Sequence, residues 1–154
     1  MKKRDFSHRF SFLVSEVAKL YGEHFDRLAR ARLGLSKAQC KVIGTLAMHG
    51  GEVPLSQAEL AQRMGLSAMS VATMCERMEA AGWLRRETPP NDRRTRWVHL
   101  EDKAHGALDE ALKISDEVQK NGLAELSAAE RTQLVALLQK ARSGLQAWQA
   151  EDEA

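Results

Sequence analysis

The chain has 154 residues, of which 44% are hydrophobic, 29% are charged and 5% are aromatic. This length supports one domain-sized core, and no apolar run approaches the roughly 18 residues that a membrane span requires. The basic N-terminus leads into no apolar signal segment. We therefore expect a single cytoplasmic unit with no membrane partner.

The net charge of +2 is unevenly distributed along the chain. Residues 1–100 carry 17 Lys and Arg against 10 Asp and Glu, a net of +7, whereas residues 101–154 carry 6 against 11, a net of −5. A basic part followed by an acidic part suits a nucleic-acid binder whose remaining surface faces away from the polyanion. A chance distribution of solvated charge is the alternative, and the counts alone do not separate the two.

Two helices are predicted at the start of the chain. Apolar residues recur at three- and four-residue steps over residues 6–32, which is typical of an amphipathic helix. Gly34 breaks this helix, and Ser36 is the expected N-cap of the second one. Residues 49–51 (HGG) end the second helix, and residues 53–55 form a short extended bridge.

Residues 55–82 predict two short helices joined by a tight turn. The segment Ser56-Gln57-Ala58-Glu59 is a capping box that opens the first helix, and Gly65 interrupts it. Ser67 is the N-cap of the second helix, which is expected to end at Gly82 in the C-cap position. The apolar face of this second helix consists of Val71, Met74, Cys75 and Met78.

A β-hairpin is predicted next, with strands at residues 84–87 and 96–100. The loop between them, residues 89–96, has the sequence PPNDRRTR, which combines turn-forming residues with a basic tip. Two strands alone are only marginally stable, so this hairpin must pack on the helices.

Two further helices complete the predicted fold. The first runs from about residue 102 to the break at residues 121–122, and a capping box at residues 127–130 opens the second. Their predicted apolar positions are Ala104, Leu108, Ala111, Leu112, Ser115 and Val118 in the first helix, and Leu134, Leu137, Leu138, Ala141, Leu145 and Trp148 in the second.

This order of elements places a winged helix-turn-helix between flanking helices. A helix fits the major groove of B-DNA with its N-terminal residues near base edges, while a basic loop can touch the backbone and the minor groove. The helix that follows Ser67 would supply the first part, and Arg93, Arg94 and Arg96 the second. A hairpin tip can be charged merely to stay solvated, but the helix-turn-helix before it favours DNA binding.

Three segments carry a resemblance to a known family: LSQAELAQRMGLS (55–67), ERMEAAGWLRRE (76–87) and DRRTRWVHL (92–100). With them the chain resembles the MarR family of transcriptional regulators, particularly its SlyA-like members. The resemblance implies a mainly α fold of six helices with a two-stranded wing, in which one unit spans residues 1–154. It also implies an entwined homodimer on a pseudo-palindromic DNA site.

Within that unit, residues 35–101 would form the DNA-binding region, and residues 1–34 with 102–154 would form the dimerisation helices. The outer helices carry more apolar positions than a lone winged domain needs, and such exposed stripes are costly in water. A monomeric bundle is the alternative, but two-fold symmetry would also set the half-site spacing of a DNA site.

The resemblance also assigns roles to individual residues. Arg93 or Arg94 would enter the minor groove, with Asp92 orienting an arginine by a charge-assisted pair. The positions expected along the major groove are Ser67, Ala68, Met69, Ser70 and Thr73. Arg77 would reach one phosphate, and Ser56 and Gln57 would offer backbone N–H groups to another.

Two positions depart from the family pattern. Thr73 stands where relatives often have Arg or Lys, and Ala68 and Met69 are also uncharged, so contacts to thymine methyls and DNA shape are expected to carry more of the specificity. Glu101 replaces the Thr that commonly follows the wing, so the next helix is expected to start from Asp102.

The resemblance further implies a sequence-specific repressor whose DNA affinity responds to a small effector, such as an aromatic or phenolic acid. The alternatives are a thiol-based oxidant sensor that uses Cys40 or Cys75, and a non-specific DNA-binding or interaction module. Both cysteines lie in helical patterns, where small buried residues are common and a disulfide is not expected. The sequence contains no recognisable catalytic motif, and no cofactor is predicted. No metal site is predicted, because the five histidines form no pair at ligand spacing with Cys or carboxylate partners.

Overall fold

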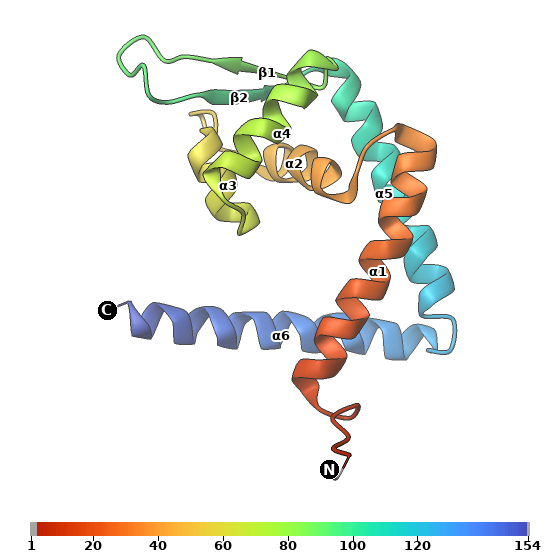
Figure 1. Cartoon of the computed structure of the whole chain (residues 1–154). Coiled ribbons are helices and arrows are strands. Elements are labelled where there is room, and N and C mark those ends of the chain that lie inside the picture. Colours follow the sequence, from red (N-terminus) through yellow and green to blue (C-terminus); the bar gives the residue numbers. More distant parts are fainter. Residues whose placement is uncertain (1–2, 154) are drawn as a thin grey trace. The chain divides into compact units, whose positions relative to one another are not determined.

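The computed structural model describes residues 3–153, which form six helices and one two-stranded sheet (Figure 1). The elements are α1 (Phe10–Leu33), α2 (Lys37–Met48), α3 (Gln57–Met64), α4 (Ala68–Ala80), β1 (Leu84–Glu87), β2 (Trp97–Leu100), α5 (Asp102–Gly122) and α6 (Ala128–Asp152). The predicted fold class is confirmed. None of the helices among the described residues is long and apolar enough to cross a membrane.

The chain divides into two compact units, one up to Asp116 and one from Glu117 onward. The first unit contains α1 to α4, the sheet and most of α5. The second contains the end of α5 and all of α6. The helix pair and the hairpin therefore belong to the same unit.

Local capping sets the ends of α3 and α4. Ser56 Oγ accepts a hydrogen bond from the Glu59 N–H, and the Glu59 carboxylate accepts one from the Ser56 N–H, so the predicted capping box is present. Gly65 ends α3 in the left-handed region with φ 65°, where a side chain would be strained. At the end of α4, Ala81 is the C-cap and the left-handed Gly82 follows it, so the C-cap lies one residue before the predicted Gly82.

The core of the first unit lies between the helix pair and the sheet. Val71, Cys75 and Met78 on α4 are buried as predicted, whereas Met74 is only half-buried. Their buried neighbours on the other elements are Val42 and Ile43 of α2, Leu60 of α3, Leu84 of β1 and Val98 of β2. Burial of these side chains on five elements fixes the helix pair against the hairpin.

The hairpin pairs in antiparallel register, with Leu84 opposite Leu100 and Arg86 opposite Val98. β2 begins at Trp97, one residue later than predicted. The chain before α3 also pairs with this strand, because the Val98 N–H donates to the Leu55 carbonyl at 2.9 Å. The predicted extended bridge thus lies along β2 and anchors the wing to the helices.

The inward face of α5 differs from the predicted one. Ala104, Ala111 and Val118 are buried as expected, but Ala107 and Ile114 complete the stripe. Leu112 is instead 57% exposed, and Leu108 and Ser115 are half-buried. Helix α5 therefore carries two apolar stripes, one buried and one more exposed. The prediction from sequence periodicity treated them as one face.

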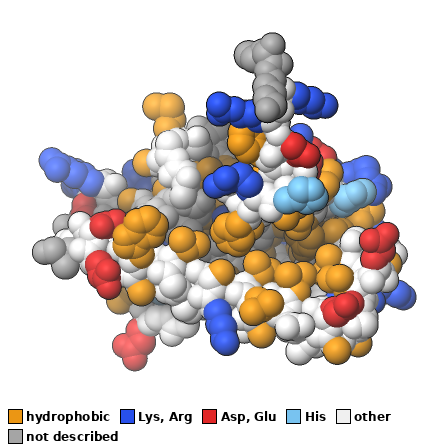
Figure 2. All heavy atoms as spheres, turned by 90° about the horizontal axis from the view of Figure 1, so that it is seen from below, with side chains coloured by type: hydrophobic (Ala, Val, Ile, Leu, Met, Phe, Trp, Pro, Cys, Tyr) orange, Lys and Arg blue, Asp and Glu red, His pale blue; other side chains and the backbone are white. Residues whose placement is uncertain are grey.

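Large apolar side chains remain exposed on several helices. On α1 they include Phe10, Leu13, Val17 and Leu20, which are 44–65% exposed. The described part of α6 has no buried residue, and its Trp148 is 61% exposed. Figure 2 shows how prominent apolar side chains are on one face of the molecule.

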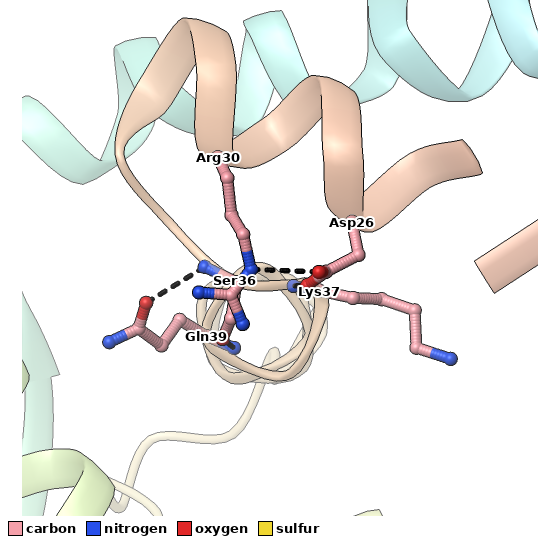
Figure 3. A network of polar contacts seen from close by, with 5 residues as sticks. All are labelled: Asp26, Arg30, Ser36, Lys37 and Gln39. Carbon is pink, nitrogen blue, oxygen red and sulfur yellow. Dashed lines mark hydrogen bonds and ion pairs between the residues drawn. The ribbon is translucent and has the colours of Figure 1, made fainter. Parts of the chain in front are cut away.

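Asp26 joins α1 to the start of α2 (Figure 3). Its carboxylate accepts hydrogen bonds from the Lys37 N–H at 2.8 Å and from Arg30 Nε at 2.7 Å. The Lys37 N–H, and next the Arg30 side chain, hold the pKa of Asp26 below its usual value. The predicted N-cap, Ser36, forms a capping box with Gln39 at the same corner.

We expect Asp26→Ala to lower the free energy of unfolding by about 1 kcal/mol, because one N-terminal N–H of α2 loses its acceptor. Asp109→Ala, at an exposed position of α5, is the matched control. Because the folded-state pKa of Asp26 is lowered, its contribution is present above about pH 4 and is lost as the pH falls. Urea unfolding at pH 7 that does not distinguish the two variants would contradict this role.

Candidate DNA interface

The first turn of α4 is an exposed surface. Ala68, Met69, Ser70 and Thr73 are all exposed, and Met69 reaches 80%. Arg77 is also exposed, two turns further along the helix. The structure thus leaves the predicted recognition positions open to a partner.

The hydroxyls at the start of α4 form a local network. Ser67 Oγ accepts a hydrogen bond from the Ser70 N–H at 3.1 Å and donates one to Ser70 Oγ at 2.8 Å. The Ser67 hydroxyl therefore has its donor and one acceptor site already in use.

Asp92 shapes the wing loop through the backbone. Its carboxylate accepts hydrogen bonds from the Arg94 N–H at 2.9 Å and from Thr95 Oγ1 at 2.6 Å. The Thr95 hydroxyl, and next the Arg94 N–H, lower the pKa of Asp92, so the carboxylate stays ionised at neutral pH. We expected Asp92 to orient an arginine side chain; instead it holds the turn that presents the arginines.

The three arginines of the loop have different surroundings. Arg96 donates from Nη1 to the carbonyls of Arg93 at 3.0 Å and Thr95 at 3.1 Å, so its guanidinium braces the loop. Arg93 and Arg94 are exposed, and within residues 3–153 their side chains show no ion pair. The free positive charge of the tip is therefore that of Arg93 and Arg94.

An ion pair between Arg86 and Glu79 ties the wing to α4. Glu79 accepts from the Arg86 N–H at 2.6 Å, from Nε at 2.9 Å and from Nη2 at 2.8 Å. The remaining Arg86 nitrogen, Nη1, lies 3.4 Å from Gln57 Oε1 of α3. One guanidinium thus connects β1, α4 and α3, and the first of these bonds is the main cause of the lowered pKa of Glu79.

Sequence reasoning missed Glu79 and Arg86 as site residues. The two lie seven positions apart on either side of the Gly82 turn, and both are in the segment 76–87 that carries the resemblance. Their opposite charges were the available signal. Their pairing depends on the angle between α4 and β1, which local periodicity does not give.

The predicted phosphate contacts at the start of α3 need correction. The Ser56 N–H donates to the Glu59 carboxylate at 2.8 Å, and the Gln57 N–H donates to the Arg96 carbonyl at 2.8 Å. Both donors are therefore engaged within the fold and are not free for a phosphate. The Ser56 N–H closes the capping box of α3, and the Gln57 N–H attaches the start of α3 to the wing.

Both cysteines are buried and free. Burial raises the pKa of the Cys40 thiol to about 11, and it also raises the pKa of Cys75 to about 11. Thiols with such pKa values are protonated at neutral pH and react slowly, which disfavours an oxidant sensor. Among residues 3–153, no group of three His, Cys, Asp or Glu side chains could hold a metal ion.

The helix pair, its open leading turn and the arginine-tipped hairpin define a winged helix-turn-helix DNA-binding protein. The sequence model of the MarR family matches residues 33–95. The transcriptional regulator HosA of Escherichia coli O111:H- is 30% identical over 125 residues, which cover 81% of this chain and 90% of HosA. The chain therefore belongs to the MarR family of DNA-binding transcriptional regulators, which are not enzymes.

Solved structures share the same fold. A MepR–DNA complex from S. aureus superposes with a TM-score of 0.71 at 20% identity, covering 88% of this chain and 97% of MepR. CouR from Rhodococcus jostii RHA1, bound to p-coumaroyl-CoA, superposes with a TM-score of 0.70 at 19% identity, covering 90% and 95% of the two chains.

We expect Glu79→Ala to loosen the wing, because Arg86 loses three hydrogen bonds to the carboxylate. Cleavage by trypsin after Arg93 and Arg94 should become about five-fold faster, as for a loss of roughly 1 kcal/mol of local stability at this partly exposed pair. Glu76→Ala, on the exposed side of the same helix, is the control. Equal cleavage rates in the two variants would show that the pair does not hold the wing.

Proposed function

We propose that this protein is a repressor that binds a pseudo-palindromic operator as a homodimer. The observation that carries the proposal is the exposed leading turn of α4 together with a wing tip whose Arg93 and Arg94 have no internal ion pair within the described residues. Residues 35–101 would form the DNA-binding region. Residues 1–34 and 102–154 would supply the dimerisation helices.

In this proposal each part of the interface has its own task. The α4 positions Ser67, Ala68, Met69, Ser70 and Thr73 lie along the major groove, and Arg77 reaches a phosphate. Arg93 and Arg94 enter the minor groove or meet its phosphates. Asp92 and Arg96 act on DNA only through the shape of the loop.

We propose that a second copy of the chain packs against the exposed apolar side chains of α1 and α6. On α1 the exposed side chains Phe10, Val17 and Leu20 are 50–65% accessible, and on α6 Leu145 and Trp148 are 57% and 61% accessible. Apolar stripes of this extent are costly in water, and a two-fold assembly would bury them in both copies at once. The same two-fold axis would place two copies of α4 on successive half-sites.

We further propose that a small aromatic effector changes the affinity for DNA. The MepR–DNA and CouR structures show that proteins of this fold hold DNA in one case and p-coumaroyl-CoA in another. In this chain, the rings of Tyr21 and Phe25 stack at 6.4 Å, and the Tyr21 hydroxyl lies 2.6 Å from Ser115 Oγ of α5. The half-open Tyr21 ring and the paired hydroxyls offer an aromatic face and a polar anchor on the proposed dimer helices themselves.

The direct test is selection of bound sites from a random duplex library by the full chain, followed by footprinting. A protected inverted repeat supports the proposal. Binding without a preferred site would overturn it and favour the non-specific module.

We expect Arg94→Ala to weaken DNA binding and to reduce the slope of log K against log salt by about one unit, because one phosphate or groove contact is lost. The variant should keep its thermal unfolding temperature, since the Arg94 side chain is exposed. Lys113→Ala removes an equal charge from α5, where the side chain is 73% exposed, and serves as the control. An unchanged binding curve for Arg94→Ala would show that the Arg94 side chain of the wing does not contribute to DNA binding.

We expect Val17→Asp to dissociate the proposed dimer, because it places a charge in an apolar contact. Light scattering should show a fall from about twice the chain mass to the chain mass of 17.2 kDa. Lys19→Asp, on the polar side of the same helix, is the control, since Lys19 is 73% exposed and its one ion pair within residues 3–153 is with Glu23. Equal masses for the two variants would argue against α1 as a dimer contact.

A further inference from the structure

We propose that the leading turn of α4 reads thymine through its 5-methyl group, with Met69 as the main contact. This inference rests on the proposed DNA-binding function and specifies the chemistry by which its major-groove surface discriminates bases.

Met69 is the most open apolar group of this surface. It is 80% exposed, although it stands in a helix whose opposite face is fully buried at Val71, Cys75 and Met78. Its thioether chain is flexible and polarizable, so it can follow an apolar surface of irregular shape. Exposed Ala68 lies beside it and extends the apolar area.

The same turn has few polar groups for reading bases, and none that could bind a purine through two hydrogen bonds. The Ser67 hydroxyl caps the helix and donates to Ser70 Oγ, so its hydrogen is already used. Residues 68–75 include no Arg, Lys, Asn or Gln, the side chains that bind purines through two hydrogen bonds. Charged groups on α4 begin only at Glu76 and Arg77, in the third turn.

One feature of the major groove matches such a surface. The thymine 5-methyl is the apolar group by which a T·A pair differs there from the other pairs. Met69 and Ala68 can pack on it, and the methyl of Thr73 can do so one turn later. The helix would thus select thymines at its half-site by apolar contact.

The test replaces thymine by uracil in a site selected by the full chain from a random library. Uracil lacks only the methyl group, so base pairing and the minor groove facing the wing are kept. Fluorescence anisotropy should show about three- to five-fold weaker binding for each contacted thymine, the size expected when one methyl group is no longer buried. Substitution outside the footprint should have no effect.

The variant Met69→Ala should bind the thymine duplex more weakly and lose most of the difference between thymine and uracil duplexes, because Met69 is the main contact. Met69→Leu should keep most of that difference. Met48→Ala removes an equally exposed methionine, 83% accessible on α2, and should bind as the unaltered protein does.

Equal affinity of the unaltered protein for thymine and uracil duplexes would overturn the inference, as would full sensitivity to uracil in Met69→Ala. In both cases specific binding would remain, so the proposed function would stand. Failure of the library selection to yield any preferred site would instead overturn the proposed function.

Discussion

The pairing of Glu79 with Arg86 is the interaction on which the geometry of the interface depends. Three hydrogen bonds to one carboxylate join the end of α4 to β1, and the same guanidinium reaches α3 through Gln57. A two-stranded hairpin has little stability of its own. Because β1 is attached to both helices, we expect the wing to be held against the recognition helix before any DNA arrives, which would reduce the ordering cost of binding.

The wing divides its polar groups between shape and contact. Asp92 uses both carboxylate oxygens inside the loop, and Arg96 uses its guanidinium on two loop carbonyls. Arg93 and Arg94 are then presented on a loop of defined conformation. A charged residue in this loop is therefore not necessarily a DNA contact. Two of the four charged groups at the tip, Asp92 and Arg96, form hydrogen bonds within the loop itself.

The elements with local determinants could be predicted from the sequence. Ser36, Ser56, Ser67 and Ser127 all accept the expected capping hydrogen bonds, because a cap involves only residues within one turn. The partner of the Gln57 N–H, 39 positions along the chain at Arg96, could not be predicted in this way, and within the loop the sequence did not show that Asp92 and Arg96 would bond to its backbone. These contacts depend on how the loop turns and on how β2 crosses the start of α3. The inward face of α5 was misjudged for a related reason: periodicity shows an apolar stripe, but not which partner covers it.

The proposed interface separates affinity from selectivity in physical terms. Contacts of Arg93 and Arg94 with the polyanion release counterions, so their contribution falls steeply as salt rises. Packing of Met69 on a thymine methyl carries no charge and depends on apolar area, which salt affects little. As salt increases, total affinity would fall while the ratio between thymine and uracil sites stays nearly constant. In this proposal Met69 and the arginines of the wing tip therefore complement each other. The arginines supply salt-dependent affinity, and Met69 supplies selectivity for thymine.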